Sequence, residues 1–185
     1  MTLRRAAFLD RDGTIIEDTG FVRDAAGVTL IRGSAEAIRR LNEAGWIVVV
    51  VTNQSGIARG LFTEKEYAAV ATQVDALLAG HGARVDATFV CPHHPEVNGP
   101  CECRKPGLKN YLAAAERFGI DFTGSIFVGD RLSDVEPAMS LGGTGILVTS
   151  GEGRLVKGEA EKAGFAIARD LKEADDRQIA RLPNR

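Results

Sequence analysis

Short apolar runs recur along this sequence, and longer stretches with helical periodicity separate them. The runs are rich in Val and Ile and cover residues 6–9, 47–51, 87–90, 125–128 and 145–148. Runs of this length and composition are typical of parallel strands that are buried on both faces. When such strands alternate with helices, right-handed crossovers build a parallel sheet between two helical layers. The sequence therefore predicts an α/β fold, a Rossmann-like doubly wound sheet in three α/β/α layers.

Cap and stop signals define three helices between the predicted strands. We expect the first to begin with Ser34 as N-cap and to stop at Gly45, and the third to stop at Gly119. The second opens with the capping-box sequence 63–66. The stripes expected to face the core are Ala35, Ile38, Leu41 and Ala44; Tyr67, Val70, Val74, Leu77 and Leu78; and Leu108, Leu112, Ala115 and Phe118.

The remaining segments limit the domain organisation. Two stretches, 17–31 and 91–107, break the alternation and are candidate functional loops, but neither is long enough for a large cap domain. After residue 151 the chain is polar, with a weak strand at 165–168, and the last four residues are expected to be disordered. We therefore predict a single domain over residues 1–185.

Charge and hydropathy exclude several classes of partner. Lys and Arg total 23 against 25 Asp and Glu, so the net charge of −2 argues against a nucleic-acid partner. The longest apolar run, 47–51, is far shorter than the roughly 20 residues of a membrane-spanning helix. No signal-peptide core follows Arg4 and Arg5. We expect a cytoplasmic monomer without membrane or nucleic-acid partners.

Two carboxylates follow the first predicted strand, where ligands bind in open α/β sheets. Asp10 and Asp12 flank Arg11, and in extended chain they point to the same side. Two like charges at one point need a cation, and carboxylate ligands favour Mg²⁺ over zinc. Asp10 could then attack a phosphoryl group to form an aspartyl phosphate, with Asp12 as general acid and then base.

Further polar residues follow the other predicted strands. Lys105 supplies a positive charge for a transferring phosphoryl group, and Asp130 is placed to complete the magnesium site with Asp10 and Asp12. Asp134 fits either a catalytic role or a cap of the short helix that follows. Donors for phosphate oxygens follow the second strand: Thr52, Asn53, Gln54 and Ser55.

Together these motifs resemble the haloacid dehalogenase-like (HAD-like) phosphohydrolase superfamily. Its pattern is D-x-D-G-T, a strand-terminal Thr or Ser, a Lys, and then G-D-x-x-x-D. Residues 10–14, Thr52, Lys105 and residues 129–134 reproduce it in order. The resemblance covers about residues 6–150, and the second aspartate, Asp12, is typical of the phosphatase and phosphomutase branch. It implies Asp10, Asp12, Thr52 and Lys105 as catalytic residues.

All three cysteines lie in one short loop with two histidines. Three thiols and one imidazole within 13 residues match a closed zinc site: Cys91, His93, Cys101 and Cys103. Three unrelated thiols are the alternative, and His94 remains an alternative to His93. His81 is expected to be a surface residue at a helix end. Four protein ligands leave no position for water, so the zinc would be structural, holding Arg104 and Lys105 against the phosphate site.

The cysteine pattern, ending in C-x-C-R-K-P, resembles a subgroup that holds heptose-1,7-bisphosphate 7-phosphatases and histidinol-phosphate phosphatases. The resemblance implies a Mg²⁺-dependent phosphomonoesterase acting on the 7-phosphate of heptose 1,7-bisphosphate. The short 93–101 loop and Arg131 instead favour histidinol phosphate, which remains the alternative substrate. A zinc-stabilised binding module without catalytic activity is the third alternative. Substrate contacts are implied for Asp18, Thr19, Gly20, Phe21, Thr52, Asn53, Gln54, Ser55, Arg104, Lys105 and Arg131.

Overall fold

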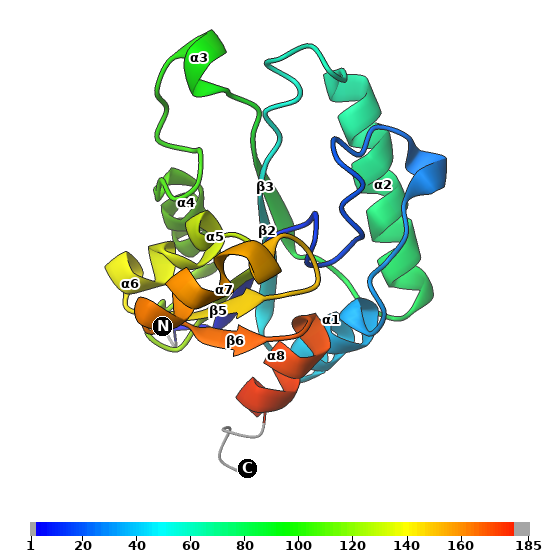
Figure 1. Ribbon diagram of the computed structural model, residues 1–185. Coiled ribbons are helices and arrows are strands. Elements are labelled where there is room, and N and C mark those ends of the chain that lie inside the picture. Colours follow the sequence, from blue (N-terminus) through cyan, green and yellow to red (C-terminus); the bar gives the residue numbers. More distant parts are fainter. Residues whose placement is uncertain (1–2, 180–185) are drawn as a thin grey trace.

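The computed structural model describes residues 3–179, which form one parallel six-stranded sheet with helices on both faces (Figure 1). The order along the sheet is β3-β2-β1-β4-β5-β6. This arrangement confirms the predicted α/β class and its three layers. The strands are β1 (Ala6–Leu9), β2 (Ile47–Asn53), β3 (Ala87–Cys91), β4 (Ile126–Gly129), β5 (Thr144–Val148) and β6 (Ala166–Ala168).

Two groups of helices form the outer layers. One face carries α1 (Ser34–Glu43), α2 (Glu64–Gly80) and α8 (Leu171–Ile179). The other carries α4 (Lys109–Phe118), α5 (Leu132–Val135), α6 (Pro137–Leu141) and α7 (Gly153–Lys162). The predicted functional loops contain η1 (Ala25–Gly27) and α3 (Pro95–Asn98), and Figure 1 shows α3 beyond the end of β3. Within residues 3–179, no helix is long and apolar enough to cross a membrane.

An aromatic cluster fixes the centre of the sheet against α4. Phe8 of β1 stacks on Phe127 of β4 at 4.8 Å between ring centroids, and its edge meets Tyr111 of α4 at 5.3 Å. All three side chains are buried. Because β1 and β4 are neighbours whose chains then diverge to opposite sides of the sheet, their carboxyl ends form the crevice where ligands bind in such folds. The cluster therefore holds the two strands that lead into this crevice.

Several local predictions are confirmed. Thr63 and Glu66 form the capping box of α2, and Val70, Val74 and Leu78 of the predicted stripe are buried. Gly45 adopts a positive φ of 78° just after α1 and donates its N–H to the carbonyl of Asn42. This is the expected glycine stop, because a left-handed conformation suits a residue without Cβ.

Several expectations differ from the structure. Gly33 is the N-cap of α1, because the Ser34 hydroxyl is used inside the fold, donating to the carbonyl of Ile15 at 2.9 Å. On α4, Leu112 is 51% exposed, because the helix is rotated to bring Tyr111 under the sheet. Helices α7 and α8 were missed because charged residues dominate their sequences. The expectation of disorder at residues 182–185 lies outside the described part of the chain.

Candidate active site

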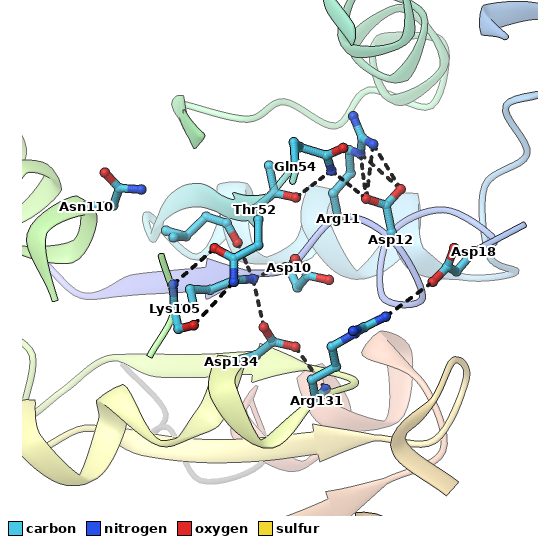
Figure 2. A network of polar contacts seen from close by, with 12 residues as sticks. Asp10, Arg11, Asp12, Asp18, Thr52, Gln54, Lys105, Asn110, Arg131 and Asp134 are labelled. Atoms are coloured by element: carbon cyan, nitrogen blue, oxygen red, sulfur yellow. Dashed lines mark hydrogen bonds and ion pairs between the residues drawn. The ribbon is translucent and has the colours of Figure 1, made fainter. Parts of the chain in front are cut away.

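Three carboxylates lie together near the carboxyl ends of β1 and β4, and two of them, Asp10 and Asp134, contact the ammonium group of Lys105 (Figure 2). Asp10, Asp130 and Asp134 each place an oxygen within 4.8 Å of the others. The Lys105 ammonium lies 2.7 Å from both Asp10 and Asp134, and donates to the carbonyl of Val51 at 2.7 Å. We call these four charged residues the acid cluster. It has three potential negative charges for one positive charge.

Burial shapes the electrostatics of the acid cluster. Asp130 is fully buried, and this burial, followed by the charge of Asp10, raises its pKa to about 7. Burial also raises the pKa of Asp134 to about 6, although the adjacent Lys105 ammonium opposes the shift. Asp130 Oδ1 is buried without a hydrogen-bond partner among the described residues. Excess negative charge and a free carboxylate oxygen fit a hard divalent cation such as Mg²⁺.

Glycines bring the backbone close to these carboxylates. A Cβ at Gly13 or at Gly151 would overlap Asp130 Oδ2, and a Cβ at Gly129 would overlap the side chain of Asp134. The same Asp130 oxygen accepts a hydrogen bond from the Glu152 N–H at 2.7 Å. The position of Asp130 is therefore set by backbone on several sides, and a methyl group at either contact would displace its carboxylate.

Asp134 caps the short helix α5, one of the two roles left open by the sequence, and it also contacts Lys105. Its Oδ2 accepts from the Arg131 N–H at 2.9 Å at the start of α5, and its Oδ1 pairs with Lys105. Burial lowers the pKa of Lys105, but the charges of Asp10 and Asp134 outweigh it and raise that pKa above its ordinary value. Asn53 fixes the Lys105 backbone, accepting from its N–H at 3.0 Å and donating to its carbonyl at 3.3 Å.

The Asp12 carboxylate is not part of the acid cluster, although the sequence predicts it beside the carboxylates of Asp10 and Asp130. It pairs with Arg11 at 3.0 Å and accepts from Gln54 Nε2 at 2.7 Å. The expected alternation of side chains fails because the strand ends at Leu9 and the chain turns, with Gly13 at φ 77°. Asp134 takes the third place in the cluster instead. Burial raises the pKa of Asp12, and the Arg11 guanidinium opposes this shift.

A cavity of about 500 Å³ opens above the acid cluster. Asp10, Asp12, Lys105 and Asp134 line it, as do all the residues expected to contact substrate except Thr19. Arg104 and Arg131 supply positive charge at this cavity, and Arg131 pairs with Glu152 at 2.9 Å. The cavity is lined by Asp10, Asp12, Asp18, Gly20, Phe21, Val22, Thr52, Asn53, Gln54, Ser55, Gly56, Arg59, His94, Arg104, Lys105, Arg131, Ser133, Asp134 and Glu152.

The cysteine loop forms a second cluster, which we call the thiol cluster: Cys91, His93, Cys101 and Cys103. Its sulfur atoms lie 3.2–3.6 Å apart, and His93 Nδ1 lies 3.3 Å from Cys103 and 3.7 Å from Cys91. Ligands at 2.3 Å from a tetrahedral zinc would be about 3.8 Å apart, so the four atoms fit one metal ion. His94 instead caps α3, its Nδ1 accepting from the Glu96 N–H.

Comparisons with known proteins point to the same HAD-like family that the sequence motifs resemble. Residues 102–174 match the HAD-hydrolase-like family. The chain is 42% identical to the D-glycero-beta-D-manno-heptose-1,7-bisphosphate 7-phosphatase of Yersinia pestis, over 84% of this chain and 86% of that protein. The chain belongs to this family of HAD-like phosphatases. The Escherichia coli K12 protein of the same name is 40% identical, over 90% of this chain and 89% of its own length.

A solved structure of the family has the same fold. The D,D-heptose 1.7-bisphosphate phosphatase from B. bronchiseptica, complexed with magnesium and phosphate, aligns with a TM-score of 0.88. It is 36% identical, and the alignment covers 96% of this chain and 99% of that one.

Sequence reasoning missed several residues of this family member's cavity. Arg59 and His94 line it, and so do Ser133 and Glu152. Sequence reasoning considered His94 only as a metal ligand, because it lies in the cysteine loop. No sequence pattern indicated Glu152, because this residue reaches the cavity from the turn after β5. The same turn contacts Asp130 through the Glu152 N–H. Conversely, Thr19 is exposed and does not line the cavity.

Proposed function

We propose that this chain is a Mg²⁺-dependent phosphomonoesterase that removes the 7-phosphate of D-glycero-D-manno-heptose 1,7-bisphosphate. The observation that carries the proposal is the position of Asp10. Its carboxylate borders the cavity and lies 2.7 Å from the buried ammonium of Lys105, in a member of a phosphatase family. A carboxylate beside a fixed cation is suited to attack a phosphorus atom whose oxygens that cation neutralises.

The residues of the cavity then divide the reaction into two steps. Asp10 attacks phosphorus, the bond between phosphorus and the C7 oxygen breaks, and Asp12 donates a proton to that oxygen. Asp12 next accepts a proton from water, which attacks the aspartyl phosphate and releases phosphate and free Asp10. Thr52 and Lys105 interact with the phosphoryl oxygens. When held by Asp10, Asp130 and Asp134, Mg²⁺ would neutralise charge on the transferring group.

The arginines of the cavity support a bisphosphate substrate. A second phosphate, remote from the scissile one, needs cations other than Lys105, and Arg59, Arg104 and Arg131 line the cavity. Arg104 follows Cys103 directly, and its guanidinium reaches back to the carbonyl of His93. A cavity built for histidinol phosphate would instead need carboxylates for an ammonium group, whereas Asp18 and Glu152, which line this cavity, both lie beside the Arg131 guanidinium.

We also propose that the thiol cluster holds a structural zinc. Four protein ligands leave no open position for water, so this metal would stabilise the loop and take no part in the chemistry. By ordering the loop it would hold Arg104 and Lys105 at the cavity. The three cysteines form no disulfide, which supports a reducing compartment, and we propose a cytoplasmic monomer formed by one domain.

A kinetic panel with Mg²⁺ tests the proposed function. The substrates are heptose 1,7-bisphosphate, histidinol phosphate and p-nitrophenyl phosphate, each measured as kcat/KM with the same protein. We expect heptose bisphosphate to exceed histidinol phosphate by at least about tenfold, because only the former offers a distal anion to the arginines. A tenfold preference for histidinol phosphate would overturn the substrate and leave the phosphatase reaction intact.

A further inference from the structure

Arg11 is a buried cation that forms an ion pair and hydrogen bonds with the Asp12 carboxylate (Figure 2). Its Nε lies 3.2 Å from both carboxylate oxygens, and its Nη2 lies 3.0 Å from both. The Arg11 side chain is 3% exposed and that of Asp12 is 21% exposed. Two guanidinium nitrogens on one carboxylate fix both its position and the plane of its oxygens, which a single ammonium group does not do.

The position of Arg11 excludes direct contact with substrate. Asp12 lines the cavity, whereas Arg11 is absent from the residues that line it. On its other side the guanidinium stacks on the ring of Tyr67 in α2, at 5.3 Å from the ring centre. Arg11 therefore lies between α2 and Asp12, and any effect on the reaction passes through that carboxylate.

A second side chain, that of Gln54, also donates a hydrogen bond to the Asp12 carboxylate. Gln54 follows β2, and its Nε2 donates to Asp12 Oδ2 at 2.7 Å and to Thr52 Oγ1 at 2.9 Å. Donors from two separate strand ends thus converge on one carboxylate. Burying a guanidinium is unfavourable unless it is paired, and Asp12 is the carboxylate that pairs with Arg11.

We infer that Arg11 is a positioning residue that, with Gln54, holds the Asp12 carboxylate in line with the leaving group. The inference rests on the proposed function, in which Asp12 protonates the departing oxygen. If the carboxylate is released, proton transfer weakens while phosphoryl binding by Thr52 and Lys105 remains. The loss then depends on the basicity of the leaving group, because a poor leaving group needs the proton and a good one departs without it.

Two esters of similar size separate this role from a structural one. Phenyl phosphate has a basic leaving group and p-nitrophenyl phosphate a weakly basic one. For Arg11→Met, which keeps an apolar stem against Tyr67, we expect kcat/KM to fall about tenfold or more with phenyl phosphate and less than about threefold with p-nitrophenyl phosphate. An equal fall with both esters, or no fall with either, would overturn the inference.

Arg11→Lys is the second variant, because it keeps the buried charge and loses the two-nitrogen contact. We expect it to fold and to lose activity selectively with phenyl phosphate; wild-type values with both esters would overturn the inference. Arg40→Met is the matched control, since it removes an arginine from the buried carboxylate of Asp175 between α1 and α8. It should lower the melting temperature and leave the ratio between the two esters unchanged.

The esters also separate this inference from the proposed function. Failure of the wild-type protein to hydrolyse both esters in the presence of Mg²⁺ would overturn the proposed function, and with it this inference. A wild-type protein that is active on both, with variants that lose activity equally on both, would overturn the positioning role of Arg11 alone.

Discussion

The acid cluster and the thiol cluster are built in opposite ways. The acid cluster gathers side chains from the ends of β1 and β4, from α5 and from the loop after Cys103, so it exists only when the sheet has formed. The thiol cluster lies within one stretch, residues 91–103. Only its first member, Cys91, is on a strand, and Cys101 and Cys103 are half-buried.

Because of this difference, we expect a bound metal to have a different effect at the acid cluster than at the thiol cluster. Glycine contacts and the buried strands β1 and β4 set the acid cluster, so its carboxylates are in place before a cation binds. The thiol loop has little regular structure beyond the four residues of α3, so a metal bound to the thiol cluster would contribute to its order. Loss of metal should therefore stop the reaction at the acid cluster and destabilise the fold at the thiol cluster.

The largest effect is expected at the nucleophile. Asp10→Asn should reduce turnover of heptose bisphosphate to below about one per cent of wild type, because an amide cannot form the aspartyl phosphate. The fold should persist, as judged by circular dichroism. Asp75→Asn, an exposed aspartate of α2, is the matched control and should leave turnover unchanged. Residual activity above a few per cent would contradict the assignment of Asp10.

The second prediction concerns the thiol cluster. Cys103→Ser and His93→Ala should abolish the bound metal, measured by elemental analysis, and lower the melting temperature, because metal binding and folding of the loop are coupled. His94→Asn is the matched control: asparagine is a good N-cap, so α3 and the metal should both be retained. Metal loss in His94→Asn with retention in His93→Ala would reverse the ligand assignment.

A smaller effect is expected from one methyl group beside Asp130. Gly151→Ala places a Cβ on Asp130 Oδ2, so the concentration of Mg²⁺ for half-maximal activity should rise about tenfold or more. Gly158→Ala on α7 meets no atom within 4 Å and should keep the wild-type Mg²⁺ requirement. It should also stabilise the helix by about 0.5–1 kcal/mol, measured by denaturant unfolding. Equal Mg²⁺ requirements for the two variants would contradict the packing argument.

The smallest effect links the two clusters. Arg104 lies between the thiol cluster and the cavity, so Arg104→Ala should raise KM for heptose bisphosphate about tenfold. The KM for p-nitrophenyl phosphate should change little, because that ester has no distal group. If Arg104 only covers the thiol loop, both KM values will rise together and the melting temperature will fall.

Local patterns predicted local structure well, and tertiary packing limited the rest. The capping box at Thr63 and the grouping of the four thiol-cluster residues are short-range patterns, and the structure brings these residues together as expected. The sequence grouped Asp12 with Asp10 and Asp130, whereas the carboxylates that lie together are those of Asp10, Asp130 and Asp134, because the turn after β1 directs Asp12 to Arg11. Nor does sequence spacing show that Glu152 reaches Asp130, because that contact forms only when β5 lies beside β4.

The most direct test of this account follows metal and activity in one sample. Gel filtration into Mg²⁺-free buffer should abolish phosphatase activity while about one zinc per chain remains bound, because carboxylate sites exchange Mg²⁺ readily and a Cys₃His site holds zinc tightly. Adding Mg²⁺ alone should then restore full activity with heptose bisphosphate. Activity that survives the loss of Mg²⁺, or that returns only with added zinc, would contradict the division between a catalytic acid cluster and a structural thiol cluster.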